Sequence, residues 1–256
     1  MKEFVSVAVE AAREAGALLF DNFGKAVEME HKADKSIVTV LDKQCQKIII
    51  DKLHSSFFSH QFIAEENGMH LEKVPMEYTW VIDPLDGTHN YIRGIPFYGV
   101  SIGLLRGNEF LAGVIYLPHE DALYVSEKGC GAFKNDQRLH ISKVTEIMDC
   151  TLAFDSGFRN SVEVKISTLK KIAPRFFNTR IFGASVRNLT YLAEGIVDAV
   201  IEFDDNMWDF AAGISLVMEA GGVVSDHSGS AFIPESRNYL ASNRNVHFQI
   251  LELLNT

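Results

Sequence analysis

Two amphipathic helices are predicted near the start of the chain. Apolar residues recur at three- and four-residue steps from Phe4 to Phe23, and Gly24 then offers a C-terminal stop. A second helix is predicted from about Thr39 to Phe57, because its apolar residues fall near one face, with Thr39 or Ser36 as the N-cap. Both helices therefore have one face to bury.

The pattern then changes to that of short strands. Phe62–Ala64 and Trp80–Ile82 are apolar runs expected to be buried strands, the second ending at Asp83. Alternating or apolar runs joined by short turns follow at 98–105, 110–116, 122–126 and 131–134. Short hairpin connections imply antiparallel pairing. Residues 1–145 therefore predict two helices laid against an antiparallel sheet.

Strands and helices alternate in residues 146–256. Strands are expected at 151–154, 179–182, 198–203, from 223 and at 240–242, and helices at 162–172, 185–194, 208–220 and 246–254. Such alternation favours a largely parallel or mixed sheet. No linker rich in proline, glycine or serine divides the halves. We therefore expect residues 1–256 to pack as one unit.

Composition narrows the classes of function. The net charge of −10 disfavours nonspecific binding to nucleic acid or to an anionic membrane, so an anionic substrate would need a local cation. Three scattered cysteines do not form a disulfide framework or a zinc motif, and they fit a reducing compartment. The acidic N-terminal residues do not resemble a secretory signal, and no apolar run is long enough to span a bilayer. A cytoplasmic protein is the expectation.

One stretch combines groups that suit a metal ion and a phosphate. Asp83 and Asp86 flank Pro84-Leu85, and Gly87-Thr88 follows. Proline stiffens the exit from the strand, and Gly87 permits a tight turn or a close backbone approach. Two carboxylates beside free backbone N–H groups suit a hard divalent cation and an anion. The alternative is an ordinary Asp-Pro turn followed by an Asp-Gly turn.

Other acids stand at the ends of predicted elements. Asp42 lies in the first turn of the second helix, where its negative charge could simply interact favourably with the helix dipole. Glu65 and Glu66 follow a strand, and at most one of two adjacent residues would normally face a site. Asp209 starts a helix, where a capping role alone would explain it. If Glu65, Asp83, Asp86 and Asp209 converge, they can hold two or three Mg²⁺ ions. Two such ions can activate water for phosphoryl transfer.

A second polar stretch precedes a helix. Gly183-Ala184-Ser185 could hold an anion or a sugar hydroxyl through its backbone N–H groups and the serine side chain. A plain helix cap is the alternative.

The spaced motifs together resemble the inositol monophosphatase family, within the lithium-sensitive, metal-dependent phosphatase superfamily. The resemblance covers nearly the whole chain. It rests on the segments Phe62–Glu66, Trp80–Thr88 with Asn90-Tyr91 and Pro96-Phe97, Trp208-Asp209 with Ala211–Gly213, and Glu219–Gly222. It implies alternating α/β/α/β/α layers, Mg²⁺ as cofactor, and commonly a homodimer.

The resemblance also implies roles for individual residues. The metal ligands would be Glu65, Asp83, Asp86, Asp209 and the backbone carbonyl of Leu85. Thr88 with Asp42 resembles the dyad that orients the attacking water, and Glu65 could share that task. The backbone N–H groups of Gly87 and Thr88 would bind the phosphate, while the substrate's hydroxyls would be held by Gly183, Ala184, Ser185 and Glu202.

Departures from the family pattern leave the substrate open. Gly183-Ala184-Ser185 stands where inositol phosphatases often have Gly-Thr-Ala or Gly-Ser-Ala, and either Lys32 or Lys35 could match a lysine near the third metal. Related short chains with a helix like that at 191–195 also dephosphorylate fructose-1,6-bisphosphate. Glu202 favours a small polyol or sugar monophosphate, with inositol monophosphate first, because a carboxylate accepts hydroxyl hydrogen bonds and repels a second phosphate.

Two alternatives remain beside that reading. One is another activity of the same superfamily, a fructose-1,6-bisphosphatase or a phosphatase of nucleotide 3′-phosphates or NADP. The other is a regulatory binding role, since some bacterial relatives also bind transcription machinery. The acidic composition offers no basic patch for direct contact with nucleic acid.

Overall fold

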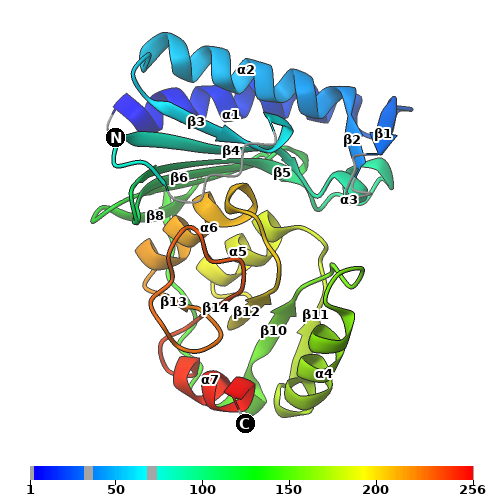
Figure 1. The fold of residues 1–256 in the computed structure, drawn as a ribbon, viewed down its shortest axis with the longest axis vertical. Helices are drawn as coiled ribbons and strands as arrows, with labels where there is room; N and C mark the ends of the chain where they lie inside the picture. Colours follow the sequence, from blue (N-terminus) through cyan, green and yellow to red (C-terminus); the bar gives the residue numbers. More distant parts are fainter. Residues whose placement is uncertain (1–2, 32–36, 68–73, 256) are drawn as a thin grey trace.

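The fold is given by a computed structural model, which describes residues 3–31, 37–67 and 74–255. Its elements stack in five layers, shown in Figure 1 from top to bottom. A helix pair covers a seven-stranded sheet, a second helix pair lies beneath that sheet, and a five-stranded sheet and a third pair complete the stack. The pairs are α1 (Glu3–Asn22) with α2 (Val40–Ser56), α5 (Ser185–Ala193) with α6 (Met207–Glu219), and α4 (Val162–Ile172) with α7 (His247–Asn255). The predicted α/β/α/β/α layering is confirmed.

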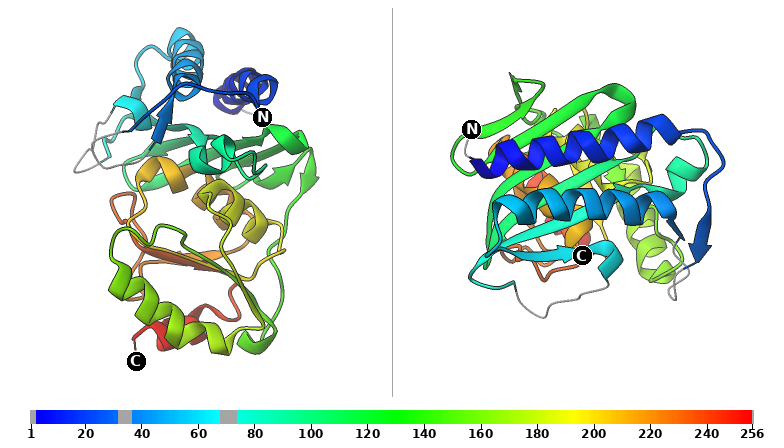
Figure 2. Two further views of the ribbon diagram at one scale, coloured as in Figure 1. Left: turned by 90° about the vertical axis from the view of Figure 1, so that its right-hand side faces the viewer. Right: turned by 90° about the horizontal axis from the view of Figure 1, so that it is seen from above.

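The first helix pair forms as its apolar periodicity predicts. The buried face of α1 carries Ala8, Ala15 and Leu19, which pack with Ile49 and Leu53 of α2 in one cluster. Small residues on that face let the two helices lie side by side on the sheet, as the view from above in Figure 2 shows.

A short hairpin leads into α2. Strands β1 (Met29–His31) and β2 (Ile37–Thr39) pair antiparallel. Thr39 then caps α2, because its side chain accepts from the N–H groups of Leu41 and Asp42. The other predicted cap, Ser36, lies outside the described residues.

The larger sheet runs in sequence order. It contains β3 (Gln61–Ala64), β4 (Tyr78–Asp86), β5 (Gly99–Arg106), β6 (Glu109–Leu117), β7 (Ala122–Glu127), β8 (Gly131–Lys134) and β9 (Gln137–Arg138). All pairs from β4 onward are antiparallel, but β3 pairs parallel with β4. The prediction of a wholly antiparallel sheet is therefore wrong at this edge. The connection from 65 to 77 is long enough to return the chain to the same end, as parallel pairing requires.

The smaller sheet has the predicted mixed pairing. Its strands are β10 (Thr151–Phe154), β11 (Asn178–Arg180), β12 (Ala199–Glu202), β13 (Val223–Ser225) and β14 (Tyr239–Ser242), in the order β11-β10-β12-β14-β13. Strand β10 is parallel to both neighbours, and β14 is antiparallel to both of its own. Strand β11 ends at Arg180, two residues earlier than predicted.

Glycines in the larger sheet bring α6 unusually close to it. A Cβ at Gly113 would lie 2.3 Å from the carbonyl oxygen of Ala212, and one at Gly103 would lie 2.8 Å from the Cβ of Ala211. Neither position therefore tolerates a side chain without moving the helix. This contact fixes the N-terminal turn of α6, which carries Asp209, beside the end of β4.

Short elements complete the described chain. They are α3 (Thr88–Ile92) and the 3₁₀ turns η1 (Glu65–Asn67), η2 (Pro118–Glu120), η3 (Ile147–Asp149) and η4 (Ala173–Arg175). Among the described residues, none of the helices combines the length and the apolar character that a bilayer crossing requires.

Candidate active site

Strand β4 continues through the Asp83–Asp86 stretch. Asp83 pairs with Ser101 of β5, and Asp86 pairs with Gly99. The chain therefore advances three residues along β4 but only two along β5 between these pairs. This register shift is a β-bulge, and it accommodates Pro84, which has no N–H for the ladder. The prediction that the strand ends at Ile82 is therefore wrong, as is the alternative of two successive turns. A bulge changes the direction in which the neighbouring side chains point, here those of Asp83 and Asp86.

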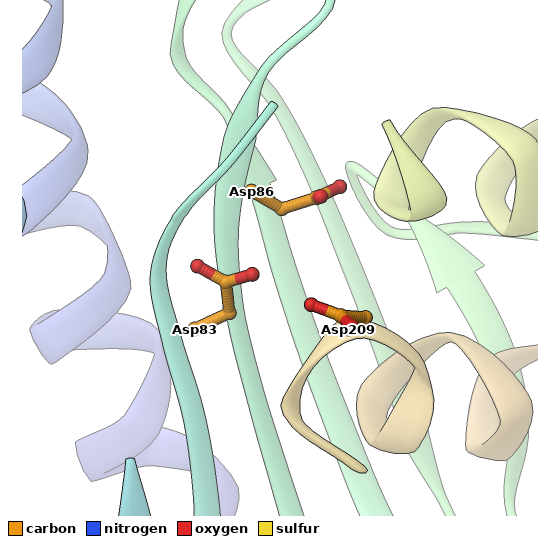
Figure 3. Close-up of side chains that lie close together, drawn as sticks. All are labelled: Asp83, Asp86 and Asp209. Atoms are coloured by element: carbon orange, nitrogen blue, oxygen red, sulfur yellow. The ribbon is translucent and has the colours of Figure 1, made fainter. Parts of the chain in front are cut away.

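Three carboxylates converge at this bulge. Oxygen atoms of Asp83, Asp86 and Asp209 all lie within 4.8 Å of one another. Figure 3 shows that β4 supplies two of these side chains and the first turn of α6 the third. Asp83 and Asp86 are buried, and Asp209 is partly exposed. Asp209 also closes a capping box with Asn206, so the predicted capping role is confirmed, and the same side chain lies in the carboxylate cluster.

Uncompensated negative charge marks this cluster. Burial raises the pKa of Asp83 well above its usual value, and the charges of Glu65, Asp86 and Asp209 raise it further, against one N–H donated by Leu85. Burial and then the charge of Asp209 raise the pKa of Asp86 to about 8. Buried like charges at this separation call for a cation, so the donor set fits a hard divalent ion.

Glu65 contributes to the same field from η1, directly after β3. Its neighbour Glu66 instead acts on Asp42, whose pKa its charge helps to raise after the larger effect of burial. The two adjacent acids therefore act on different carboxylates, although they lie in the 3₁₀ turn η1, where the strand alternation assumed in the prediction does not apply.

Asp42 and Thr88 are brought together from positions 46 residues apart. The Oγ1 of Thr88 lies 3.2 Å from Oδ1 of Asp42 and 2.9 Å from the carbonyl oxygen of Leu85, placed to donate to either. Asp42 is fully buried, and its other oxygen accepts from the Thr39 N–H at 2.8 Å. A response to the helix dipole therefore does not account for Asp42 by itself.

The backbone turns sharply between β4 and α3. Gly87 has φ +81°, and a Cβ there would lie 2.6 Å from the carbonyl oxygen of Phe97. Both the left-handed conformation and the close approach require glycine. The Gly87 N–H helps to lower the pKa of Asp86, so it faces that carboxylate. Its predicted contact with phosphate stays a prediction.

The start of α5 faces the carboxylate cluster. The N–H of Val186 donates to Oδ2 of Asp86 at 2.7 Å. Ala184 occupies the N-cap position without a side-chain cap bond, and Ser185 Oγ donates across to Asp205 at 3.3 Å. Gly183, with φ +78°, turns the chain into this position. The alternative of a plain helix cap is therefore wrong for Ser185.

Glu202 ends β12 inside the protein. It is 3% exposed, so Glu202 is not a surface acid. The Nδ2 of Asn188 donates to its Oε1. Burial, and then the charge of Asp155, raises the pKa of Glu202 well above its usual value. The carboxylate is thus a buried acceptor held by one amide.

A pocket of about 250 Å³ joins these groups. Asp86 and Asp209 line one end of it, Gly183, Ala184 and Ser185 line a wall, and the rest of the lining comes from Asp155, Ser156, Gly157, Asn160, Lys165, Asn188, Glu202, Phe203, Asp204 and Asp205. Asp86 from the first stretch, the 183–185 segment, Glu202 and Asp209 therefore meet in one cavity, whereas Asp83 and Thr88 are not among its lining residues.

Sequence reasoning missed several lining residues, among them Asp155, Lys165, Asn188 and Asp205. Asp155 directly follows a predicted strand and Asp205 lies between two candidate residues, so position could have marked both. Lys165 and Asn188 lie within helices and carried no such signal. The candidate lysines Lys32 and Lys35 lie outside the described residues.

Comparison with known proteins gives one consistent result. The family model described as "Inositol monophosphatase family" matches residues 1–256. Inositol monophosphatase 2 of Solanum lycopersicum is 36% identical, covering 100% of this chain and 99% of its own length. A fructose-1,6-bisphosphatase/inositol-1-monophosphatase of Aquifex aeolicus is 35% identical over 99% and 96%. The Nus factor SuhB of Escherichia coli is 36% identical over 96% and 93%.

Solved structures agree with the fold. The extragenic suppressor protein suhB of Bartonella henselae superposes with a TM-score of 0.91 at 32% identity, covering 100% of this chain and 99% of that one. The IMPase of Thermotoga maritima gives a TM-score of 0.90 at 30% identity, covering 99% and 97%. The similarity in both sequence and structure thus extends over the whole chain.

Proposed function

The chain belongs to the inositol monophosphatase family and is a phosphatase, and we propose that it hydrolyses a small polyol or sugar phosphate with Mg²⁺. Inositol monophosphate is the first candidate substrate. The observation that carries this proposal is the convergence of Asp83, Asp86 and Asp209, of which Asp86 and Asp209 also line a pocket rich in hydrogen-bond acceptors.

The donor set fits Mg²⁺ by its chemistry. Carboxylate oxygens from Asp83, Asp86, Asp209 and Glu65, with the carbonyl of Leu85, are the hard oxygen ligands that this ion prefers. The buried like charges at the cluster support the same assignment, because they require a cation for balance. When bound, two or three such ions supply Lewis acidity toward the phosphate and a more acidic water. The ion count is part of the proposal.

The protein's own groups would then position the attacking water. The Thr88 hydroxyl is held between Asp42 and the Leu85 carbonyl, so it can relay a proton from water towards the Asp42 carboxylate. We assign a share of this role to Glu65, at the start of η1, whose charge acts on Asp83. The backbone N–H groups of Gly87 and Thr88 would hold the phosphate oxygens.

The far end of the pocket would bind the alcohol part of the substrate. Glu202 and the 183–185 segment line the same pocket as Asp86 and Asp209, and Glu202 is a buried acceptor for hydroxyl groups. A carboxylate there disfavours a second phosphate, which argues against fructose-1,6-bisphosphate, nucleotide bisphosphates and NADP. The Aquifex relative's name keeps fructose-1,6-bisphosphate as the second candidate.

A regulatory role is the candidate from another class. The Escherichia coli relative is named a Nus factor, which supports testing this chain for a partner. The net charge of −10 gives no support to direct binding of nucleic acid. A homodimer and a cytoplasmic location are further proposals from the family resemblance, and light scattering of the purified protein tests the first.

A substrate panel with Mg²⁺ tests the proposal. Phosphate release is measured from inositol monophosphate, fructose-1,6-bisphosphate, adenosine 3′,5′-bisphosphate and NADP, with and without EDTA and with lithium. We expect Mg²⁺-dependent, lithium-inhibited release, fastest from inositol monophosphate. Full activity after exhaustive dialysis against EDTA would contradict the metal assignment. No release from any ester by a folded protein would favour the regulatory role.

A further inference from the structure

The part of the pocket that lies away from the metal ligands offers acceptors for hydrogen bonds. Asn188 is 3% exposed, and its Oδ1 has no hydrogen-bond partner among the described residues, although it lines the pocket. Glu202, Asp204 and Asp205 add carboxylate oxygens to the same lining. A buried acceptor without a partner is costly, so a ligand that fills this space must bring donors.

The buried side-chain donors on these walls are already used within the protein. The Nδ2 of Asn188 donates to Glu202, and the Oγ of Ser185 donates to Asp205. Tyr239 donates to the same carboxylate at 3.1 Å. Ser156 and Asn160 also line the pocket, but both are exposed at its rim. The inner surface therefore presents unfilled acceptor capacity and few free donors.

The single lysine among the described lining residues does not offer an anion site. The Nζ of Lys165 lies 2.5 Å from Asp155, 2.7 Å from the carbonyl oxygen of Gly157 and 3.7 Å from Asp204. Its side chain is 2% exposed, so its charge is committed to these acceptors. Arg237 contacts the same segment, but its guanidinium donates to the backbone carbonyls of Asp204 and Asp205 and to Asn206, outside the lining.

The formal charge of this region is unbalanced. Apart from the proposed metal ligands Asp86 and Asp209, the described lining carries four acids and one lysine, a formal charge of −3. Neutral hydroxyls satisfy the acceptors but provide no countercharge for the acids that ionise there, whereas an ammonium group provides both the donors and the countercharge. The acids of this region, Asp155, Glu202, Asp204 and Asp205, stand on the side of the pocket that the alcohol part of a substrate would occupy.

We propose that this enzyme prefers phosphate monoesters whose alcohol part carries a protonated amine, an amino sugar or amino alcohol phosphate. The inference rests on the proposed phosphatase function and names its substrate class. The phosphate would lie at the end formed by Asp83, Asp86 and Asp209, and the ammonium would lie among Glu202, Asp205 and the Oδ1 of Asn188. The cleaved bond and the products, alcohol and inorganic phosphate, are those of the ordinary hydrolysis.

Matched substrate pairs test the preference. The kcat/KM of the Mg²⁺-loaded protein is measured for glucosamine 6-phosphate against glucose 6-phosphate, and for ethanolamine phosphate against ethylene glycol phosphate. Within each pair only an ammonium replaces a hydroxyl. We expect a preference of ~10-fold or more for the amine in at least one pair, the scale of a hydrogen bond to a charged group. In Asp205→Asn the ratio should fall towards one.

A matched control separates direct contact between the ammonium and the pocket acids from the general attraction of an acidic protein for a cation. Glu163 is exposed in the first turn of α4, and Glu163→Gln removes the same charge away from the pocket lining, so its ratio should stay that of the wild type. Should Asp205→Asn not fold, the dependence of the wild-type ratio on salt gives the second measurement, because direct contact with buried or partly buried acids is screened less than the general field.

Three outcomes are distinguishable. A wild-type preference for the amine that Asp205→Asn loses and Glu163→Gln keeps supports the inference. Equal rates, or a preference for the hydroxyl in both pairs, overturn it and leave the phosphatase function standing. No hydrolysis of these esters, of inositol monophosphate or of an aryl phosphate would overturn both.

Discussion

The two ends of the pocket hold their carboxylates by different means. At the metal end, Asp83, Asp86 and Asp209 accept from the backbone N–H groups of Leu85, Val186 and Asn206. At the alcohol end, Glu202 and Asp205 accept from the side chains of Asn188, Ser185 and Tyr239. Asp155 combines both means, since it accepts from the Gly157 N–H and pairs with Lys165.

This difference explains why substitutions can alter the geometry of one end of the pocket more easily than that of the other. Backbone donors stay in place whatever the neighbouring side chains are, so the chemical end keeps its geometry through changes of sequence. Side-chain donors change with a single substitution, so the alcohol end can be adapted to another substrate without moving the metal ligands. Substitutions at the first end should therefore affect every substrate, and substitutions at the second should affect some substrates only.

The largest effect is expected at the metal end. Asp83→Asn should lower kcat/KM for every substrate by ~10³-fold or more, since loss of a ligand removes several kcal/mol of metal-assisted stabilisation. Without metal, the same variant should be at least as stable as the wild type, because it removes one of several buried like charges. Steady-state kinetics and thermal unfolding in EDTA measure both. An active variant within tenfold of the wild type would exclude Asp83 as a ligand.

The next effect tests the dyad beside the metal end. Thr88→Ala should lower kcat by ~10²–10⁴-fold with little change in KM, because it removes a positioned proton relay used in the transition state. Thr88→Ser, which keeps the hydroxyl, is the matched control and should retain most of the activity. If the alanine variant stays within threefold of the wild type, water activation does not depend on Thr88.

A smaller and selective effect is expected at the alcohol end. Glu202→Gln should raise KM for inositol monophosphate by ~10–150-fold, the cost of a lost hydrogen bond to a charged acceptor. An aryl phosphate without hydroxyls should be nearly unaffected. Equal effects on the two substrates would place Glu202 among the structural residues and remove the distinction between the two ends.

The last effect concerns the stability of the folded protein and its dependence on pH at the metal end, rather than activity. The pKa of Asp86 rises from 3.8 to about 8 in the folded protein, so the folded state retains a proton that the unfolded chain has released. The stability from this group is present below pH 3.8 and is lost as pH rises towards 8. In EDTA, Tm should therefore fall between pH 5 and pH 8, at roughly 2–4 °C per kcal/mol lost.

Saturating Mg²⁺ and Asp86→Asn serve as controls for that measurement. Each should reduce the pH dependence without abolishing it, because the Asp86 carboxylate is then either ionised on the metal or absent, while Glu202 and Asp205 keep their raised pKa values. Calorimetry at several pH values gives the slope. A Tm in EDTA that rises steadily over this range would contradict the assignment of unbalanced charge to the cluster.

Much of the architecture follows from local pattern. The periodicity of α1 and α2, the hairpins from β5 to β8 and the alternation of the second half were all predicted, because each depends on residues close in sequence. The parallel pairing of β3 with β4 was not predicted, since it depends on the path of a connection rather than on the strands. The continuation of β4 past Pro84 was also missed, because a proline can stand in a bulge.

The sequence by itself determined the family, the layered fold and the candidate site residues. It could do so because short motifs contain the residue types and spacings that binding of a metal ion and a phosphate requires. Only the tertiary structure brought Asp42 to Thr88 and Asp86 to the N–H of Val186, across 46 and 100 residues. It alone placed Asn188, Lys165 and Asp205 in the pocket. Side-chain contacts between distant elements leave no local periodicity, so the lining that selects the substrate became visible only once the layers had packed.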